Sequence, residues 1–366
     1  MSGIPDMETI YVAISGHGFG HATRTIAVIN TWRRLLRQRG SPDVLPIFVT
    51  GIPMWLFERS VEGEFLYRGR GLDVGVIQSD SLRMDLAATH RALVELQQRA
   101  PSLIRAEADF IRLNRCRLVF ADLPPLAAAI AQAAGIPCWV AGNFGWDFIY
   151  RGFGEAFADV VGWIEGLNQQ CDRTFRLPFH EPMASFPNRT DIGLTGAEPK
   201  YDRQTIASKL HLDPDRPTIL LTFGGLGLET VPYDNIRDFP DWQFLTLESK
   251  APDLPNLQCL NGQMWRPVDV MPLCQAILCK PGYGTFSEAI RTGIGVYALT
   301  RDGFAEAPLL LEGLQRYAPH RILPHSQVLT GPWDFLNQPL SPPRDPGGID
   351  LEGNRSLATE LADFFS

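Results

Sequence analysis

The 366-residue sequence has little lysine, no excess of basic charge and no long apolar run. Its 33 Lys and Arg residues are outnumbered by 41 Asp and Glu residues, and the formal net charge at pH 7 is −8. Because binding to a nucleic-acid backbone needs a basic footprint, this composition argues against nucleic acid as a partner. Apolar runs such as residues 218–223 have strand length, far below the ~20 residues of a membrane-spanning helix.

Two further absences concern targeting and cysteine chemistry. Residues 1–8 have neither basic residues nor an apolar stretch, so the start does not resemble a secretory signal. The six cysteines form no C-x-x-C pair and have no neighbouring pair of histidines, which argues against disulfide cross-links and structural zinc. The sequence therefore predicts a cytoplasmic protein with reduced, mostly buried cysteines and no bound metal. Lysine is confined to Lys200, Lys209, Lys250 and Lys280.

Short β-branched runs alternate with segments of helical periodicity. The first half predicts strands at 9–14, 44–50, 118–121 and 138–141 and helices at 22–38, 93–113 and 126–134. The second half predicts strands at 218–223, 242–246, 257–260, 276–279 and 296–300 and helices at about 285–292 and 305–317. Strands separated by helices indicate parallel βαβ units, with ligands at the carboxyl ends of the strands.

The two alternations are separated by a stretch rich in proline and glycine, residues 178–200. This pattern predicts two α/β domains that join near residue 195. Residues 327–348 are also dense in proline and glycine and predict an irregular surface segment, followed by an amphipathic helix at about 353–364. Residues 32–39 combine arginines with Trp32 and Leu36. They predict either a peripheral contact with an anionic membrane or, as the favoured interpretation, a helix end whose apolar residues pack inward.

A glycine- and histidine-rich loop, Ser-Gly-His-Gly-Phe-Gly-His-Ala-Thr-Arg at residues 15–24, joins the first strand to the first helix. Glycines let backbone approach a ligand, and a helix start favours an anion. His17 and His21 are candidate general bases, because histidine accepts a proton near neutral pH. Asp122, at the end of another strand, is expected to orient one of them. The alternative is a plain strand-to-helix turn, with Asp122 capping a helix and His17 packed against the loop.

A nicotinamide-binding fold is disfavoured by the same loop. The fingerprint G-x-G-x-x-G requires glycine where His21 stands, and the second strand ends in Thr50 without the acidic residue that binds ribose.

A second glycine-rich turn follows the strand at 276–279 and carries Lys280, Gly282 and Gly284. A diphosphate at this helix start would meet backbone amides and the hydroxyls of Thr285 and Ser287. Glu288, one turn further, is placed to reach a ribose diol. The alternative is a capping box, in which Thr285 and Glu288 satisfy each other's backbone amides without any ligand.

Taken together, these motifs resemble GT-B glycosyltransferases such as the lipid II N-acetylglucosaminyltransferase and the UDP-glycosyltransferases. More narrowly, residues 14–24, 143–150 and 282–285 resemble the glycosyltransferase-like N-terminal region of plant L-arabinokinases. The sugar-kinase half of those proteins has no counterpart here, so the resemblance does not imply kinase activity.

The resemblance implies an α/β protein of the GT-B class, with two facing Rossmann-like domains and a central cleft. It places an acceptor domain at 1–190, a donor domain at 191–350 and a C-terminal helix at 351–366 that packs back toward the N-terminal domain. It further implies metal-independent transfer of a hexosyl or pentosyl group, without a cofactor, from a nucleotide sugar, expected to be a UDP-sugar, to a hydroxyl acceptor. A non-catalytic nucleotide-sugar binding module and a sugar-nucleotide epimerase are the alternatives.

The resemblance also implies roles for particular residues. His21 stands where the lipid II enzyme has its loop histidine, and His17 is closer to the base of the UDP-glycosyltransferases, so both stay candidates beside Asp122. The donor would be bound by Gly225, Gly227, Lys280, Gly282, Gly284, Thr285, Ser287, Glu288 and Glu306. The acceptor would be bound by Gly18, Phe19, Asn143, Trp146 and Asp147.

Overall fold

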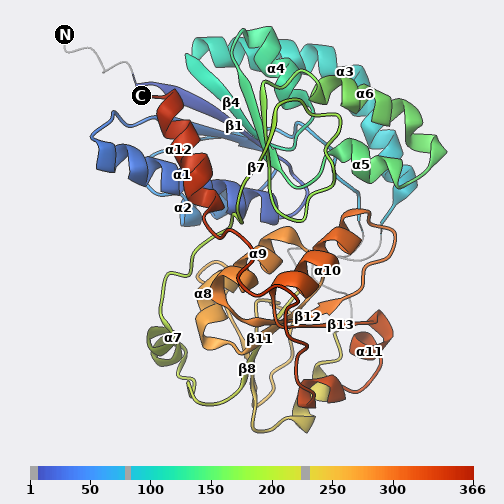
Figure 1. Cartoon of the computed structure of the whole chain (residues 1–366). Helices are drawn as coiled ribbons and strands as arrows, with labels where there is room; N and C mark the ends of the chain where they lie inside the picture. Colours follow the sequence, from blue (N-terminus) through green and yellow to red (C-terminus); the bar gives the residue numbers. More distant parts are fainter. Residues whose placement is uncertain (1–6, 79–83, 224–230) are drawn as a thin grey trace.

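The computed structural model describes residues 7–78, 84–223 and 231–366, and it contains two parallel sheets, one in each half of the chain (Figure 1). The seven-stranded sheet has the order β3-β2-β1-β4-β5-β6-β7, and the six-stranded sheet has the order β10-β9-β8-β11-β12-β13. In both sheets the order reverses beside the first strand of the half, β1 or β8, so each half is a Rossmann-like unit with its ligand edge at that switch point.

The N-terminal half contains the elements of the larger sheet and its helices. They are β1 (Thr9–Ile14), α1 (Gly20–Arg39), β2 (Leu45–Thr50), α2 (Met54–Ser60), β3 (Leu66–Gly69), α3 (Leu86–Leu113), β4 (Cys116–Asp122), α4 (Leu126–Ala134), β5 (Cys138–Gly142), α5 (Trp146–Arg151), α6 (Ala158–Asn168), β6 (Arg173–Arg176) and β7 (Arg189–Asp191).

The C-terminal half contains the smaller sheet, and the last helix follows it. The elements are α7 (Arg203–Leu210), β8 (Thr218–Thr222), β9 (Gln243–Thr246), β10 (Leu257–Cys259), α8 (Pro267–Val270), β11 (Ala276–Cys279), α9 (Tyr283–Thr292), β12 (Gly295–Leu299), α10 (Glu306–Tyr317), β13 (His320–Leu323), α11 (His325–Leu329) and α12 (Gly353–Phe364).

The predicted strands agree with the structure to within two residues at each end, whereas four short strands at or near the sheet edges were not predicted. These strands, β3, β6, β7 and β13, have three or four residues each and carry arginine or histidine, so they form no continuous apolar run. The helix predicted at 93–113 begins earlier, at Leu86, because the Asp85 carboxylate accepts a hydrogen bond from the Ala88 amide at 2.8 Å and caps it.

Helix α1 buries its apolar stripe against the first sheet and against α12. Trp32 and Leu36 are buried, and the Trp32 ring lies 5.2 Å from that of Phe365. Arg33 is buried as well and pairs with Asp43. The inward-packing interpretation of residues 32–39 is therefore confirmed, and the apolar residues of the proposed membrane contact are not on the surface. No helix among the described residues is long and apolar enough to cross a membrane.

Helix α12 lies beside α1, on the N-terminal half of the molecule (Figure 1). Its apolar residues Leu357, Ala358, Leu361 and Ala362 are fully covered, and Arg39 and Arg173 pair with acidic residues on its surface. The chain therefore crosses between the two halves twice, once after β7 and once before α12.

The segment 327–348 differs from its prediction as a surface run. It is irregular, but Val328, Trp333 and Phe335 are buried in the core of the smaller sheet. The burial of these aromatic and aliphatic side chains holds the segment against the sheet, although its prolines and glycines keep its backbone irregular. All six cysteines are free, and five are buried, with Cys259 exposed.

Candidate active site in the interdomain cleft

A cavity of about 1150 Å³ lies between the two halves, at the carboxyl edges of both sheets. The N-terminal wall consists of the loops after β1, β2 and β3, together with Phe144 after β5. The C-terminal wall consists of the loops after β8, β9, β10, β11 and β12. The cavity therefore occupies the position at which parallel α/β sheets bind ligands, on both sheets at once.

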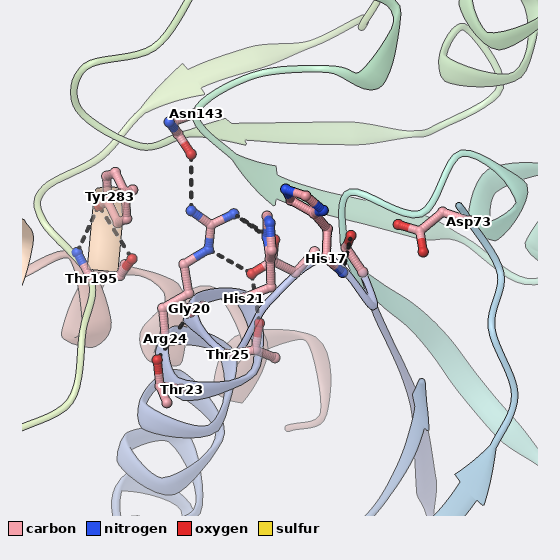
Figure 2. Close-up of polar contacts among 12 residues, drawn as sticks. His17, Gly20, His21, Thr23, Arg24, Thr25, Asp73, Asn143, Thr195 and Tyr283 are labelled. Carbon is pink, nitrogen blue, oxygen red and sulfur yellow. Dashed lines mark hydrogen bonds and ion pairs between the residues drawn. The ribbon is translucent and has the colours of Figure 1, made fainter. Parts of the chain in front are cut away.

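His21 lies on the N-terminal wall beside Arg24 (Figure 2), and its ring contacts the carboxylate of Asp122. Strands β1 and β4 are parallel neighbours with Ile14 opposite Asp122, so the loop after β1 starts beside the end of β4. His21 Nδ1 lies 2.9 Å from Asp122 Oδ1. Arg24, one turn along α1, donates from Nε to Asp122 Oδ2 at 2.6 Å and from Nη2 to Oδ1 at 2.5 Å. The Thr25 hydroxyl donates to Oδ2 at 2.9 Å.

These contacts fix the protonation of Asp122. Burial by itself raises the pKa of the Asp122 carboxyl, but the charges and hydrogen bonds of Arg24 and His21 outweigh burial and hold that pKa well below its usual range. Because an ionised carboxylate only accepts hydrogen bonds, the contact with Asp122 favours the His21 tautomer that carries its proton on Nδ1, although Arg24 Nη2 also lies 3.1 Å from this nitrogen. His21 lines the cavity, and its Nε2 is the ring atom left with a lone pair.

His17 is held differently. Its Nδ1 accepts a hydrogen bond from the Val76 amide at 3.3 Å, and its ring stacks on Phe304 at 6.1 Å and meets Trp146 edge to face at 5.3 Å. Burial, then the charges of His21 and Arg301, lower the pKa of His17 to about 3. A group this weakly basic is neutral at pH 7 and a poor proton acceptor.

The His21–Asp122 network continues across the cleft. Arg24 Nη1 donates to Asn143 Oδ1 at 2.9 Å, and Asn143 Nδ2 donates to Glu306 Oε1 at 2.6 Å. Glu306 begins α10 in the C-terminal half and lines the cavity. A second link is Tyr283, the first residue of α9, whose ring lies 5.0 Å from the Arg24 guanidinium and whose hydroxyl accepts a hydrogen bond from the Thr195 amide.

Asp73, which the sequence did not reveal, contacts the loop after β1 from the segment after β3. Its Oδ1 accepts a hydrogen bond from the Gly16 amide at 3.2 Å, and Oδ2 has no partner among the described residues. Burial raises the pKa of Asp73, although hydrogen bonds from Ser15 and Gly16 oppose this. The sequence analysis missed Asp73 because it did not predict β3. An aspartate just after a strand indicates a site residue only when the strand itself has been recognised.

Helix α9 presents an uncapped N-terminus to the cavity. Gly282 is its N-cap residue and makes no side-chain cap, so the capping box of Thr285 and Glu288 is absent and that alternative was wrong. Lys280, Gly282, Gly284 and Thr285 all line the cavity. A methyl group added at Gly284 would lie 3.7 Å from the Cα of Gly20, so the starts of α1 and α9 approach each other closely.

Ser287 and Glu288 both contact the connecting segment at 195–197, but only Glu288 also lines the cavity. Ser287 is fully buried, does not line the cavity and donates to the Thr195 carbonyl at 2.8 Å, so the structure places it away from the expected diphosphate. Glu288 lines the cavity, and its Oε1 accepts a hydrogen bond from the Ala197 amide at 3.3 Å. Burial raises the pKa of Glu288 to about 7, against the opposing charge of Arg266.

Of the residues predicted to bind an acceptor, some line the cavity and others do not. Gly18 and Phe19 line the cavity. Asn143, Trp146 and Asp147 do not, because all three are buried beneath it. Asn143 holds Arg24 and Glu306, and Asp147 accepts hydrogen bonds from Asn168 and Ser185. Aromatic and polar residues after a strand can belong to the core as readily as to a site. Here they are buried and pack beneath the residues that line the cavity.

Two predicted donor residues, Gly225 and Gly227, lie outside the described residues. Arg301, which the sequence analysis did not single out, lines the cavity on the loop after β12. Within the described parts of the chain, no three His, Cys, Asp or Glu side chains gather as metal ligands.

The fold with its two facing Rossmann-like sheets is the GT-B fold, as expected, and glycosyltransferases are among its structural neighbours. MurG of Acinetobacter baumannii matches with a TM-score of 0.52 at 15% identity, over 98% of this chain and 94% of that one. Os79 of O. sativa, solved in complex with U2F and trichothecene, matches with a TM-score of 0.63 at 15% identity, over 98% of this chain and all of that one, 100%.

At the sequence level, no protein-family model matches the chain. An L-arabinokinase of Arabidopsis thaliana is 29% identical over 351 residues, which is 92% of this chain. The chain spans about a third of the length of that relative, 32%. The similarity is thus to one portion of a longer protein.

Proposed function

We propose that the protein transfers a sugar from a UDP-sugar to a hydroxyl acceptor. The observation that supports this most directly is the arrangement of one cavity, with the His21–Asp122 pair on one wall and the uncapped start of α9 on the other. Such a cavity has a base for an incoming hydroxyl and an anion site for a leaving diphosphate. Because the chain spans only a third of the L-arabinokinase, kinase activity is not proposed.

His21 is the general base in this proposal. Its Nε2 accepts the proton of the acceptor hydroxyl while the hydroxyl oxygen bonds to the anomeric carbon and the bond from that carbon to the diphosphate oxygen breaks. Asp122 keeps the ring in the required tautomer and stabilises the imidazolium that forms. The proposal does not assign this role to His17, because burial lowers its pKa to about 3 and its ring packs on Phe304 and against the edge of Trp146.

The donor lies on the C-terminal wall. The first amides of α9 and the Thr285 hydroxyl bind the diphosphate, Lys280 adds positive charge, and Glu288 accepts hydrogen bonds from the ribose hydroxyls. We propose that no metal and no further cofactor takes part, because the helix start and Lys280 supply the charge that the leaving diphosphate needs.

Incubation with UDP-sugars labelled in the sugar, across a panel of hydroxyl acceptors, tests the proposal. Transfer of label to an acceptor is the expected result. Tight binding without transfer or donor hydrolysis would instead identify a nucleotide-sugar binding module, and a changed sugar on the nucleotide without any acceptor would identify an epimerase. His21→Gln and Asp122→Asn are each expected to lower the rate of transfer by at least about 10²-fold while UDP binding persists.

A further inference from the structure

Arg301 is a buried cation on the cavity wall, and no described residue forms an ion pair with it. Only 8% of the residue is exposed, and its guanidinium carbon lies 3.9 Å from the centroid of the Phe304 ring. Its Nε and Nη2 atoms are buried and have no hydrogen-bond partner among the described residues. Burying hydrogen-bond donors without partners is unfavourable, and for an ion the cost is larger still.

Other buried arginines of this protein show what this part of a guanidinium binds. Arg24 places Nε and Nη2 on the two oxygens of Asp122, at 2.6 and 2.5 Å. Arg266 places the same two atoms on the two oxygens of Asp269, at 2.9 and 2.5 Å. In Arg301 the same edge has no carboxylate, although the geometry of the edge suits a planar anion with two oxygens.

Glu306, whose charge acts on Arg301, does not serve as that partner. Burial lowers the pKa of Arg301, and the charge of Glu306 only partly opposes this. Glu306 is instead hydrogen-bonded to Asn143. An arginine side chain stays protonated in proteins, so a full positive charge faces the cavity at this point.

The position of Arg301 relates it to the sugar end of a bound donor. Strand β12 pairs with β11, so the loop that carries Arg301 lies next to the loop that starts α9. Glu288 marks the nucleoside side, because it lies one turn into α9 beside Ala197 of the connecting segment. Arg301 lies on the other side, with Phe304 stacked on His17 in the loop that also carries His21. The reacting sugar must lie between the diphosphate and His21.

We propose that Arg301 binds a carboxylate of the transferred sugar, so that the preferred donor is a nucleotide-linked uronic acid. This inference rests on the proposed donor site. On binding, the Nε–Nη2 edge of Arg301 rotates from its buried position onto the two carboxylate oxygens, within the guanidinium plane that lies over the Phe304 ring.

Calorimetric titration of UDP, UDP-glucose and UDP-glucuronate into the whole chain tests the inference. UDP-glucose and UDP-glucuronate differ only in the group at the sugar C6, so their ratio of Kd values isolates the carboxylate. We expect the wild-type protein to bind UDP-glucuronate at least about tenfold more tightly than UDP-glucose. Arg301→Gln should lose this preference while its Kd for UDP changes by less than about twofold.

Two further variants make the result interpretable. Arg301→Lys keeps the charge without the two-donor edge and should retain only part of the preference. Arg316→Gln, on the exposed surface of the neighbouring α10, is the matched control and should behave as the wild type. Thermal unfolding of each variant establishes that it is folded.

Each other outcome overturns the inference. Equal weakening of all three ligands by Arg301→Gln would assign the residue to the diphosphate. An unchanged set of Kd values would leave it a structural residue. If the wild-type protein bound both sugar nucleotides equally, the carboxylate would not be recognised, and if it bound not even UDP, the donor site itself would be refuted.

Discussion

On the N-terminal side of the cleft, Asp122 accepts hydrogen bonds from His21, Arg24 and Thr25. On the C-terminal side, two nitrogens of Arg301 have no partner in the described parts of the chain, and the start of α9 has no side-chain cap. Both oxygens of Asp122 are satisfied within the first network, which therefore needs no ligand. The second wall has polar groups whose pairing is completed by an anionic ligand. This difference fits a division of labour in which one wall keeps a base in place and the other binds a charged substrate.

The largest effect is expected from opening the closed network at its centre. Asp122→Asn removes the charge that pairs with buried Arg24, and it should lower the free energy of unfolding by about 3–5 kcal/mol. Because the pKa of Asp122 is held low in the folded state, its stabilising effect is present above the unfolded-state pKa and disappears as the pH falls through the folded-state pKa. Urea unfolding at neutral and acidic pH measures the loss.

Asp191→Asn is the matched control for this experiment. Asp191 pairs with Arg176, but its side chain is 61% exposed, so its removal should cost less than about 1 kcal/mol. Equal losses for the two variants would show that the buried network does not stabilise the N-terminal half as described.

The second effect compares two histidines of one loop. His21→Gln should lower turnover by about 10²–10⁴-fold, because it removes a base, with little change in the affinity for UDP. His17→Gln removes a neutral ring from its stack on Phe304, so it should lower stability and leave the pH dependence of turnover in place. Kinetics between pH 5 and pH 9, with each variant's stability measured separately, would distinguish them. A His17→Gln protein that lost the pH dependence instead would reverse the assignment.

The positions of His21 and Asp122 could be predicted, because they depend on local elements. A glycine loop after β1 and an aspartate at the end of β4 meet wherever the two strands are parallel neighbours, and strand periodicity identified both strands. The turn before α9 could be placed for the same reason. GT-B architecture followed from two such alternations in one chain and from the resemblance of the motifs.

Other features could not be predicted, because they depend on side chains that meet through the tertiary structure. Nothing in the sequence separates Ser287, which faces the connecting segment, from Thr285, which faces the cavity, until the helix is known to start at Tyr283. The link from Asn143 to Glu306 exists only because the two halves face each other. Arg301 stood out only once its neighbours were known.

The third effect concerns Glu288 on the C-terminal wall. Its pKa is raised by burial to about 7, from about 4.3 in an unfolded chain. The folded state therefore binds more protons than the unfolded state between these values, and its stability falls as the pH rises through that window. Glu288→Gln removes this pH dependence. Between pH 4 and pH 8 the free energy of unfolding of the variant should therefore gain about 3 kcal/mol relative to that of the wild type.

The affinity of Glu288→Gln for UDP tests the ribose role separately. A carboxylate accepts stronger hydrogen bonds than an amide, so the wild-type affinity should rise between pH 6 and pH 8 and exceed that of the variant. Unchanged affinity with the stability effect intact would mean that Glu288 is a buried acid without contact to the donor.

The smallest effect separates two hydroxyls of α9 that differ only in the side of the helix they occupy. Thr285→Val keeps the shape of a cavity-lining residue and removes a donor to phosphate, so it should weaken UDP binding by about tenfold with little change in stability. Ser287→Ala removes the hydrogen bond to the Thr195 carbonyl and should lower stability by about 1 kcal/mol with unchanged UDP affinity. Calorimetry measures the affinity of each variant for UDP, and thermal unfolding measures the stability of each. If Ser287→Ala weakened UDP binding and Thr285→Val did not, the diphosphate would lie on the side of α9 that the structure shows buried, and the assignment of the C-terminal wall would have to be reversed.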